Sequence, residues 1–373
     1  MKVLMKGNEA ICEAAMAAGC KLFFGYPITP QNEIPEYMSA KLDSIGGTFV
    51  QAESEIAAIN MVYGASAAGA RVMTSSSSPG IALKQEGISY MAGAKLPALI
   101  VSVARCGPGL GGILPGQADY FMTTRGGGNG DYYMPVYAPN SVQEATDMVF
   151  KAFDVADKYR TPVTILIDGM LGQMMEPVEI KPTPEQKFDK SWATDGNSDK
   201  RPRNIVNSLS LLGETLEKMN HERFQVYDEI IKAETLVENG VQDGDEIAIV
   251  AYGAPSRVCQ SAVEELREQG IKAGLIRPIT LWPYPYDIFQ SLPASVKHIL
   301  VCELSMGQMI EDVKLGVSGK YPVHFYGRTG GVIFEVEEIV NETKKILGLK
   351  FDPAWDFNVS KSKSCSNVKG VAN

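Results

Sequence analysis

Short apolar runs alternate with helix-like segments along the first 180 residues of the chain. Each run has about the length of a buried strand, and turns of small residues separate the runs from the helical segments. The runs cover residues 22–24, 71–74, 98–103 and 163–167. Strands that alternate with helices and lack a polar face are typical of a parallel sheet covered on both sides. The pattern therefore predicts an α/β domain over residues 1–180.

The alternation stops near residue 181 and resumes near residue 244. Residues 181–243 are rich in Pro, Lys, Asp, Asn and Ser, which is typical of a linker or arm and not of a core. Within this span, residues 214–232 are strongly charged and helix-like. We expect an extended linker that carries one helix.

The second alternating region predicts a smaller α/β domain over residues 244–350. Its expected strands cover residues 247–253, 272–278 and 299–303, and its expected amphipathic helix covers residues 256–268. Residues 351–373 form a C-terminal tail. We expect this tail to be mobile from Lys361 onward, because it is rich in Ser, Lys and Asn.

The charge balance excludes some classes of protein. The chain has 35 Lys and Arg residues against 44 Asp and Glu residues, a net charge of −9, and no long basic run. This balance disfavours nucleic-acid binding. No apolar stretch approaches the roughly 20 residues that cross a bilayer, and the first residues are too short and broken for a secretory signal. We therefore expect a cytoplasmic protein that does not enter a membrane.

The cysteines and histidines do not form a recognisable metal or hydrolase pattern. Six cysteines occur without any C-x-x-C pair, which disfavours an iron–sulfur or zinc motif. We expect most of them to be reduced core residues. None of the three histidines stands near a G-x-S-x-G signature, which disfavours a hydrolytic triad. We predict no metal site on this chain.

Two candidate stretches follow the first strands of the N-terminal domain. In Gly25-Tyr-Pro-Ile-Thr-Pro30, the two prolines restrict the backbone around Thr29 and fix the direction of its hydroxyl. Thr29 alone is best explained as a helix cap. In Gln51-Ala-Glu-Ser-Glu-Ile-Ala-Ala58, Glu53 and Glu55 open a helix of small residues. The helix dipole explains such acids, and the same placement suits a carboxylate in a partly dry site.

Two more candidate stretches follow later strands. Thr74-Ser-Ser-Ser-Ser-Pro-Gly80 places hydroxyls at a helix start, which suits an anion or a polar cofactor edge and equally suits N-capping. Arg105-Cys-Gly-Pro-Gly-Leu-Gly-Gly112 places an arginine where open α/β sheets bind ligands. Its guanidinium matches a carboxylate. A surface ion pair on a mobile loop explains Arg105 about equally well.

These four stretches, in this order and at this spacing, resemble the first domain of the pyruvate:ferredoxin oxidoreductase superfamily. The similarity continues in the second domain through Arg277-Pro-Ile-Thr-Leu-Trp-Pro283, Glu303-Leu-Ser-Met-Gly-Gln308 and Phe325-Tyr-Gly-Arg-Thr-Gly-Gly331. It covers nearly the whole chain outside the linker and the tail. The resemblance implies an alpha-type subunit, with a pyrimidine-type thiamin-diphosphate domain followed by a transketolase C-terminal-like domain.

The resemblance also implies roles for single residues. In that family the acid of the pattern Glu-x-x-Ala-x-x-x-x-x-Gly hydrogen-bonds the ring nitrogen N1′ of the cofactor and favours its imino tautomer. Glu55 matches that acid, with Glu53 as its rival. Thr29 and Arg105 match residues that hold the carboxylate and carbonyl oxygen of the substrate. The expected cofactor-binding residues are Glu55, Ser76, Ser77 and Pro27. Ser76, Ser77 and Ser78 stand where many relatives carry Thr-Ser-Gly.

One family pattern is missing from the chain. Thiamin enzymes usually bind the diphosphate and magnesium through Gly-Asp-Gly followed by Asn. Here Gly130-Asp131 lacks the second glycine, and Asp243-Gly-Asp245 leads into an expected strand. The resemblance thus implies a beta subunit that supplies the diphosphate and Mg site. It further implies gamma and ferredoxin-like delta subunits, iron–sulfur clusters on those partners, and ferredoxin and coenzyme A as reaction partners.

The substrate class follows from two segments, 105–112 and 117–120, which are most similar to branched-chain members of the family. They imply oxidation of 2-oxoisovalerate to an acyl-CoA, with 2-oxoglutarate as the alternative. A non-catalytic scaffold is disfavoured because it needs neither Glu55 nor Arg105. A self-contained thiamin decarboxylase is disfavoured by the missing metal motif, and a nicotinamide dehydrogenase by the absence of its glycine fingerprint.

Overall fold

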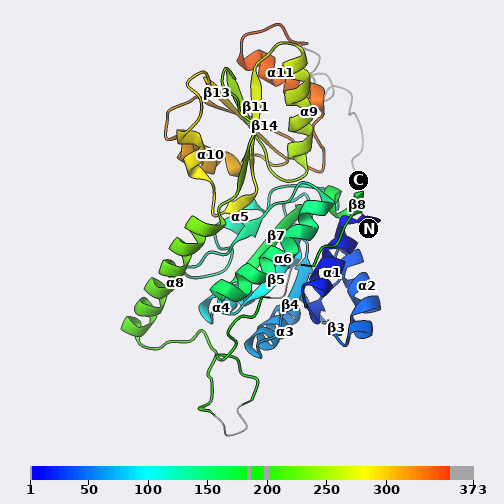
Figure 1. Ribbon diagram of the computed structural model, residues 1–373, viewed down its shortest axis with the longest axis vertical. Helices are drawn as coiled ribbons and strands as arrows, with labels where there is room; N and C mark the ends of the chain where they lie inside the picture. The colour runs from blue at the N-terminus through cyan, green and yellow to red at the C-terminus, as the bar shows by residue number, and fades with distance from the viewer. Residues whose placement is uncertain (1, 183–185, 197–200, 353–373) are drawn as a thin grey trace, which may run out of the picture.

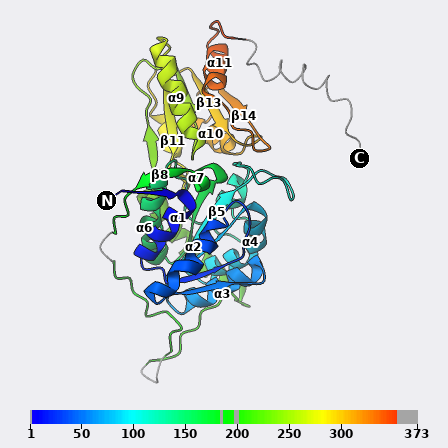
Figure 2. The ribbon, with the colours of Figure 1, turned by 90° about the vertical axis from the view of Figure 1, so that its right-hand side faces the viewer.

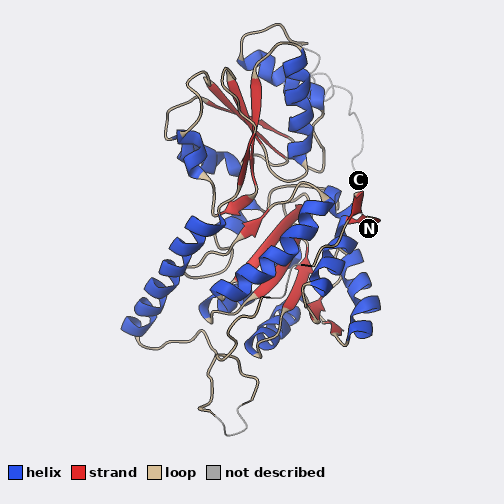
Figure 3. Ribbon diagram, viewed as in Figure 1, coloured by secondary structure: helices blue, strands red, loops and turns tan. Residues whose placement is uncertain are grey.

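The computed structural model describes residues 2–182, 186–196 and 201–352. Figure 1 shows two α/β units, the N-terminal one below and the second one above. In Figure 3 the strands of each unit form a central layer between helices. The predicted class, two successive α/β units with parallel sheets, is confirmed.

The N-terminal unit is built on a seven-stranded sheet in the order β12-β6-β7-β5-β4-β2-β3. All neighbours pair in parallel except β12, which is antiparallel to β6. The four predicted strands correspond to β2, β4, β5 and β7. The strand bounds are β2 (Leu22–Gly25), β3 (Thr48–Gln51), β4 (Val72–Ser76), β5 (Ala98–Ala104), β6 (Val136–Tyr137), β7 (Pro162–Asp168) and β12 (Thr280–Trp282).

Helices cover both faces of this sheet, as Figure 2 shows from the side. One core lies against α1 (Gly7–Ala17), α2 (Glu33–Lys41) and α6 (Val142–Tyr159). The other lies against α3 (Glu55–Ala67) and α4 (Ser78–Gly93). Strands that are apolar on both faces need this double cover. The short elements are η1 (Leu42–Ile45), α5 (Tyr120–Thr124), α7 (Gly169–Gln173) and the antiparallel pair β1 (Val3–Lys6) and β8 (Met175–Val178).

The predicted charged helix of the linker is α8 (Gly213–Glu234), which runs along the side of the N-terminal unit in Figure 1. Its buried Tyr227 packs edge-on against Trp282, with ring centroids 5.4 Å apart. The linker range also contains β9 (Val237–Asn239), which pairs with β11 (Ala273–Pro278) in the second sheet. β9 has only three residues, and its middle residue is the polar Glu238, so it shows no hydrophobic periodicity from which the sequence could predict a strand.

The second unit has a five-stranded sheet in the order β14-β13-β10-β11-β9, antiparallel only at β9. The three predicted strands correspond to β10, β11 and β13, and the predicted helix corresponds to α9. The remaining bounds are β10 (Ile247–Val250), α9 (Pro255–Glu268), η2 (Tyr286–Gln290), β13 (His298–Glu303), α10 (Met309–Val317), β14 (Val323–Gly327) and α11 (Val336–Ile346). Residues 361–373, predicted to be mobile, lie outside the described residues.

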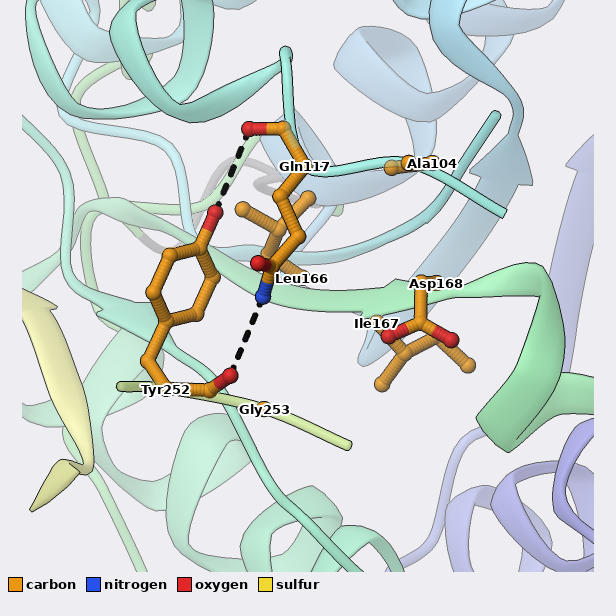
Figure 4. Close-up of a pocket in the computed structure, with 8 residues that line it drawn as sticks. Ala104, Gln117, Leu166, Ile167, Asp168, Tyr252 and Gly253 are labelled. Atoms are coloured by element: carbon orange, nitrogen blue, oxygen red, sulfur yellow. Dashed lines mark hydrogen bonds between the residues drawn. The ribbon is translucent and has the colours of Figure 1, made fainter. Parts of the chain in front are cut away.

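The two units are joined by buried polar contacts as well as by the chain. Gln117 from the N-terminal unit donates to the backbone carbonyl of Tyr252 in the second unit (Figure 4). Gln117 also hydrogen-bonds the backbone N–H and carbonyl of Leu304. Arg277 forms a bidentate ion pair with Glu144, at 2.9 Å for both hydrogen bonds. Two of the second-unit motifs thus have structural roles: Arg277 fastens the junction, and Glu303 accepts the backbone N–H groups at the start of α10.

Candidate functional site

The carboxyl ends of four adjacent parallel strands carry the predicted site residues. Glu55 follows β3, Thr29 follows β2, Ser76 ends β4 and Arg105 follows β5. Because β3, β2, β4 and β5 are neighbours in the sheet, their ends meet at one edge. Open α/β sheets bind ligands at this edge. The topology therefore gathers residues that lie up to 76 positions apart in the sequence, as in the contact between Thr29 and Arg105.

Glu55 is the first residue of α3 and is 6% exposed. Ser54 caps the helix, because its hydroxyl accepts the backbone N–H of Ala57 at 3.1 Å. Glu53, the rival acid, is exposed and precedes the helix. Within the described part of the chain, no group donates a hydrogen bond to the Glu55 carboxylate. The two acids thus occupy different environments, and the buried one is available to accept a hydrogen bond.

Gly80, in the first turn of α4, brings two polar groups close to this helix. A Cβ atom at Gly80 would lie 2.1 Å from the Ser76 hydroxyl and 2.6 Å from Oε1 of Glu55. Only glycine leaves room for such an approach. The hydroxyls of Ser76 and Ser77 are buried and have no hydrogen-bond partner among the described residues. Partnerless buried hydroxyls are rare in folded proteins and suggest a ligand.

Arg105 lies in a buried isolated bridge directly after β5 and is 6% exposed. Its Nη1 donates to the Thr29 carbonyl and its Nη2 to the Leu110 carbonyl, each at 3.0 Å. Its backbone N–H donates to the Ser78 hydroxyl at 3.0 Å. The surface ion-pair explanation is therefore wrong, because the guanidinium is buried and bonds carbonyl oxygens. Nε of Arg105 is buried and lacks a partner in the part of the chain that the structure describes.

Thr29 lies on the loop between β2 and α2, and its hydroxyl accepts from the Asn32 amide at 3.4 Å. The cap explanation for Thr29 is wrong, because the N-cap position of α2 belongs to Asn32. Pro27 lies on the same loop and is exposed. The structure thus brings Thr29 to Arg105 and Ser76 to Glu55, and it leaves Pro27 exposed on the loop after β2.

A cleft of about 760 Å³ opens beside Arg105. The N-terminal unit contributes Arg105 and its glycine-rich loop, Asp119, Phe121 and Met122, and the second unit contributes Met306, Gln308 and Thr329. Most of the exposed lining area is apolar. Concave, largely apolar sites with a few polar groups are typical of small-molecule binding.

Asp119 is a site residue that the sequence did not single out. It is 6% exposed, and burial raises its pKa from 3.8 to about 6, although the Ser78 hydroxyl and the Arg105 charge lower it. Its Oδ2 is buried and has no partner among the described residues. A carboxyl group with a raised pKa inside a cleft is a common feature of functional sites. Its one signal in the sequence was its place within the segment 117–120, which indicated the substrate class.

Lys84 is the second residue that the sequence analysis missed. It is 0% exposed in α4, one turn after Gly80, and burial lowers its pKa from 10.5 to about 7 while the Glu55 charge raises it. A signal existed in the sequence, because Lys84 stands three residues after Ile81 and four before Ile88. This spacing puts it on the apolar face of the helix.

Other kinds of site find less support. No group of three or more His, Cys, Asp and Glu side chains in the described residues is arranged to hold a metal ion. Cys12, Cys20, Cys106, Cys259 and Cys302 are buried and free, in agreement with the prediction for most cysteines, and Cys365 lies outside the described residues. No described helix is both long and apolar enough for a membrane span.

Family models and curated relatives match most of the chain. The model "Pyruvate flavodoxin/ferredoxin oxidoreductase, thiamine diP-bdg" matches residues 13–244, and "Pyruvate:ferredoxin oxidoreductase core domain II" matches residues 245–339. The ketoisovalerate oxidoreductase subunit VorB of Methanothermobacter thermautotrophicus is 48% identical, over 92% of this chain and 98% of that protein. The 2-oxoglutarate synthase subunit KorA of Methanothermobacter marburgensis is 34% identical, over 93% and 98%.

Solved structures agree with this similarity. The 2-oxoglutarate:ferredoxin oxidoreductase from Magnetococcus marinus matches with a TM-score of 0.81 and 27% identity, over 92% of this chain. This chain spans only 65% of that longer chain. A split-gene transketolase shares the fold alone, with a TM-score of 0.57 and 14% identity. The resemblance inferred from the motifs is confirmed, and the chain belongs to the pyruvate flavodoxin/ferredoxin oxidoreductase family, as a subunit of the 2-oxoacid:ferredoxin oxidoreductase type.

Proposed function

We propose that this chain is the alpha-type subunit of a complex that oxidises 2-oxoisovalerate, transfers the acyl group to coenzyme A and reduces ferredoxin. The observation that carries the proposal is the meeting of Glu55, Ser76 and Arg105 at one sheet edge. The 48% identity to a ketoisovalerate oxidoreductase subunit supports the branched-chain substrate. The reaction releases carbon dioxide, and the electrons freed by decarboxylation pass to ferredoxin.

The residues present fit the aminopyrimidine half of thiamin diphosphate. The Glu55 carboxylate is an acceptor without a donor in the described chain, and the buried Ser76 and Ser77 hydroxyls lack partners. Glu55 would accept a hydrogen bond from ring nitrogen N1′, and the two serines would bind polar atoms at the ring edge. When bound, the cofactor supplies an electron sink for decarboxylation. Pro27 would contact it from the loop after β2.

Arg105 would hold the substrate's carboxylate. A guanidinium has five N–H donors. Two side-chain nitrogens of Arg105 donate to the carbonyls of Thr29 and Leu110, and its Nε, which has no partner among the described residues, can still donate to a substrate. The Thr29 hydroxyl would bind the carbonyl oxygen. Burial strengthens such charge-assisted hydrogen bonds and excludes water from the reacting atoms.

The cleft beside Arg105 favours a monocarboxylate with an apolar side chain. Of the described residues that line it, Arg105 is the single cation, and Asp119 is acidic. Pro79, Ala82, Phe121 and Met122 present apolar surface. A second carboxylate, as in 2-oxoglutarate, would meet no basic partner there and would face Asp119. The branched alkyl group of 2-oxoisovalerate matches this lining.

The rest of the machinery would belong to partner subunits. The chain lacks the Gly-Asp-Gly and Asn pattern, so we assign the diphosphate and Mg site to a beta subunit. We assign the iron–sulfur clusters to gamma and ferredoxin-like delta subunits, because the cysteines of this sequence lack cluster spacing. This chain would then be active only in the assembled complex.

The direct test is 2-oxoacid-dependent reduction of viologen by this chain, alone and with co-expressed partner subunits, in the presence of thiamin diphosphate, magnesium and coenzyme A. The substrates are 2-oxoisovalerate, 2-oxoglutarate and pyruvate. Activity only in the complex, highest with 2-oxoisovalerate, supports the proposal. A preference for 2-oxoglutarate would reassign the substrate, and silence of an intact, cofactor-loaded complex would favour a scaffold.

A further inference from the structure

Lys84 occupies an unusual position on α4. It is 0% exposed, whereas the preceding Leu83 is 51% exposed. The helix therefore turns a lysine into the core and a leucine toward the surface. Burying a lysine is costly, and lysines are almost never fully buried without a partner. This placement calls for a function that leucine would not serve.

The contacts of Lys84 fix the end of β4. Its Nζ donates to the Thr74 hydroxyl at 2.7 Å and to the Ser75 carbonyl at 2.9 Å. The Thr74 hydroxyl in turn donates to the Phe24 carbonyl in β2, at 2.6 Å. Lys84 thus ties α4 to two strands directly before Ser76, one of the residues that we assign to the cofactor.

Lys84 forms no ion pair with the residues that the structure describes, in contrast to Arg71, which pairs with Asp154 and Asp157. Glu55 on α3 is the charged group that acts on it. The residues that it contacts on β4, Thr74 and Ser75, do not titrate near neutral pH. Gly80 lies four residues before Lys84 on the same face of α4, and a Cβ atom added there would lie 2.6 Å from Oε1 of Glu55. Glu55 thus lies near the first turn of α4, close enough for its charge to act on Lys84 but beyond ion-pair distance.

We propose that Lys84 is a positioning residue for Glu55: its nitrogen fixes the strand end beside the carboxylate, and its proton charge competes with the cofactor ring for that carboxylate. This inference rests on the proposed function, because it needs Glu55 to meet N1′. In the neutral form, Lys84 keeps its hydrogen bonds to Thr74 and Ser75 and leaves the negative charge of Glu55 to the ring.

The sign of the effect follows from burial. The pKa of Lys84 is lowered to about 7, so the amine is mostly neutral above that pH and carries a charge below it. A charged Lys84 repels positive charge on the ring and draws the Glu55 carboxylate toward itself. Cofactor binding and turnover should therefore weaken as the pH falls through about 7, by at most tenfold for each pH unit.

The test uses the assembled complex and three variants. Lys84→Gln keeps a hydrogen-bond donor without the charge, and Lys84→Met removes both. Lys95→Met is the matched control, because Lys95 follows the same helix and its side chain is 37% exposed. Gel filtration checks assembly, fluorescence titration gives the Kd of thiamin diphosphate, and viologen reduction gives kcat/KM, each between about pH 6 and about pH 8.

We expect the wild type and Lys95→Met to lose roughly tenfold in cofactor affinity from pH 8 to pH 6, and both Lys84 variants to lose much less. Lys84→Met should also bind less tightly at pH 8, because the strand end is no longer held. Asp119→Asn, run in parallel, removes a cleft carboxyl group whose pKa is also raised to about 6, and it should keep the wild-type loss of affinity. The inference is overturned if both Lys84 variants keep the wild-type pH dependence. Unchanged turnover of Glu55→Gln would instead overturn the proposed function.

Discussion

Gln117 and Tyr252 exchange hydrogen bonds in both directions across the junction of the two units (Figure 4). The Gln117 amide donates to the Tyr252 carbonyl at 3.0 Å, and the Tyr252 hydroxyl donates to the Gln117 carbonyl at 3.2 Å. Both residues are buried, with 3% and 2% of their surface exposed. Because Gln117 is two residues from Asp119, this contact also sets the position of the cleft wall.

Gln117→Ala should destabilise the chain by about 1–3 kcal/mol, because it leaves the Tyr252 carbonyl and the Leu304 N–H buried without their partner. The free energy of unfolding, from urea titration followed by circular dichroism, measures the loss. Gln269→Ala is the control, since Gln269 bonds Glu265 on the surface and should change stability by less than about 0.5 kcal/mol. Equal stability of the two variants would contradict a role for Gln117 in the junction.

Asp119 should make stability depend on pH. Its pKa in the folded chain is about 6, above the ordinary value of 3.8, so the folded state binds more protons between these values. The free energy of unfolding should therefore fall as the pH rises from about 4 to about 6, by roughly 2–3 kcal/mol from this group, and level off above. Asp119→Asn should remove this fall. Urea titrations of the wild type and of Asp119→Asn at about pH 4 and about pH 7 measure how much of the pH dependence Asp119 causes. Asp168 has a similarly raised pKa, but it is present in both proteins, so its contribution cancels in the comparison.

Glu55→Gln should leave assembly intact and lower kcat by at least about 100-fold, because an amide does not support the same tautomer of the cofactor ring. Viologen reduction by the complex measures the effect. Glu53→Gln is a closely matched control, since Glu53 is two residues away but exposed. Comparable losses in both variants would point to a general effect of charge at the start of α3.

Arg105→Ala should chiefly raise KM for the 2-oxoacid, by roughly 10- to 100-fold, since it would remove the charge-assisted hydrogen bonds that we propose to the substrate carboxylate. Steady-state kinetics of the complex separates KM from kcat. Arg257→Ala, at an arginine whose side chain is 44% exposed, serves as the control. A loss of stability with unchanged KM would assign Arg105 a structural role only, through its bonds to Thr29 and Leu110.

The sequence predicted β2, β4, β5, β7, β10, β11 and β13, because strands of this kind have a local pattern. Apolar runs indicated β2, β4, β5 and β7, and the turns after these strands contained candidate site residues. The pattern did not reveal β1, β3, β6, β8, β9, β12 or β14. β9 and β12, for example, have three residues each and are defined only by their partners in the sheet. β12 follows β11 in the sequence but pairs with β6 in the first sheet, and no local sequence pattern indicates this pairing.

Single residues of the site were predictable only where a motif singled them out. Glu55 and Glu53 look alike in the sequence, and it is the start of α3 at Glu55 that buries one and exposes the other. Burial of Arg105 depends on carbonyl groups at Thr29 and Leu110, which no pattern reports. Asp119 acquires its raised pKa from three-dimensional burial alone. These properties arise from packing and not from the order of residues.

Two helix glycines provide the sharpest test of the site's geometry. A methyl group at Gly80 would lie 2.1 Å from the Ser76 hydroxyl and 2.6 Å from Glu55, whereas a methyl group at Gly64 in α3 meets nothing within 4 Å. Gly64→Ala should therefore stabilise the chain by about 0.5–1 kcal/mol, since alanine is the better helix former, and leave turnover unchanged. Gly80→Ala should push Glu55 and Ser76 away from the helix, so the complex should lose at least about tenfold in kcat/KM with the helix content unchanged. Circular dichroism and viologen reduction measure both variants. If Gly80→Ala retained full turnover, Glu55 and Ser76 would not need their close approach to α4, and the cofactor contacts assigned to them would have to be given up.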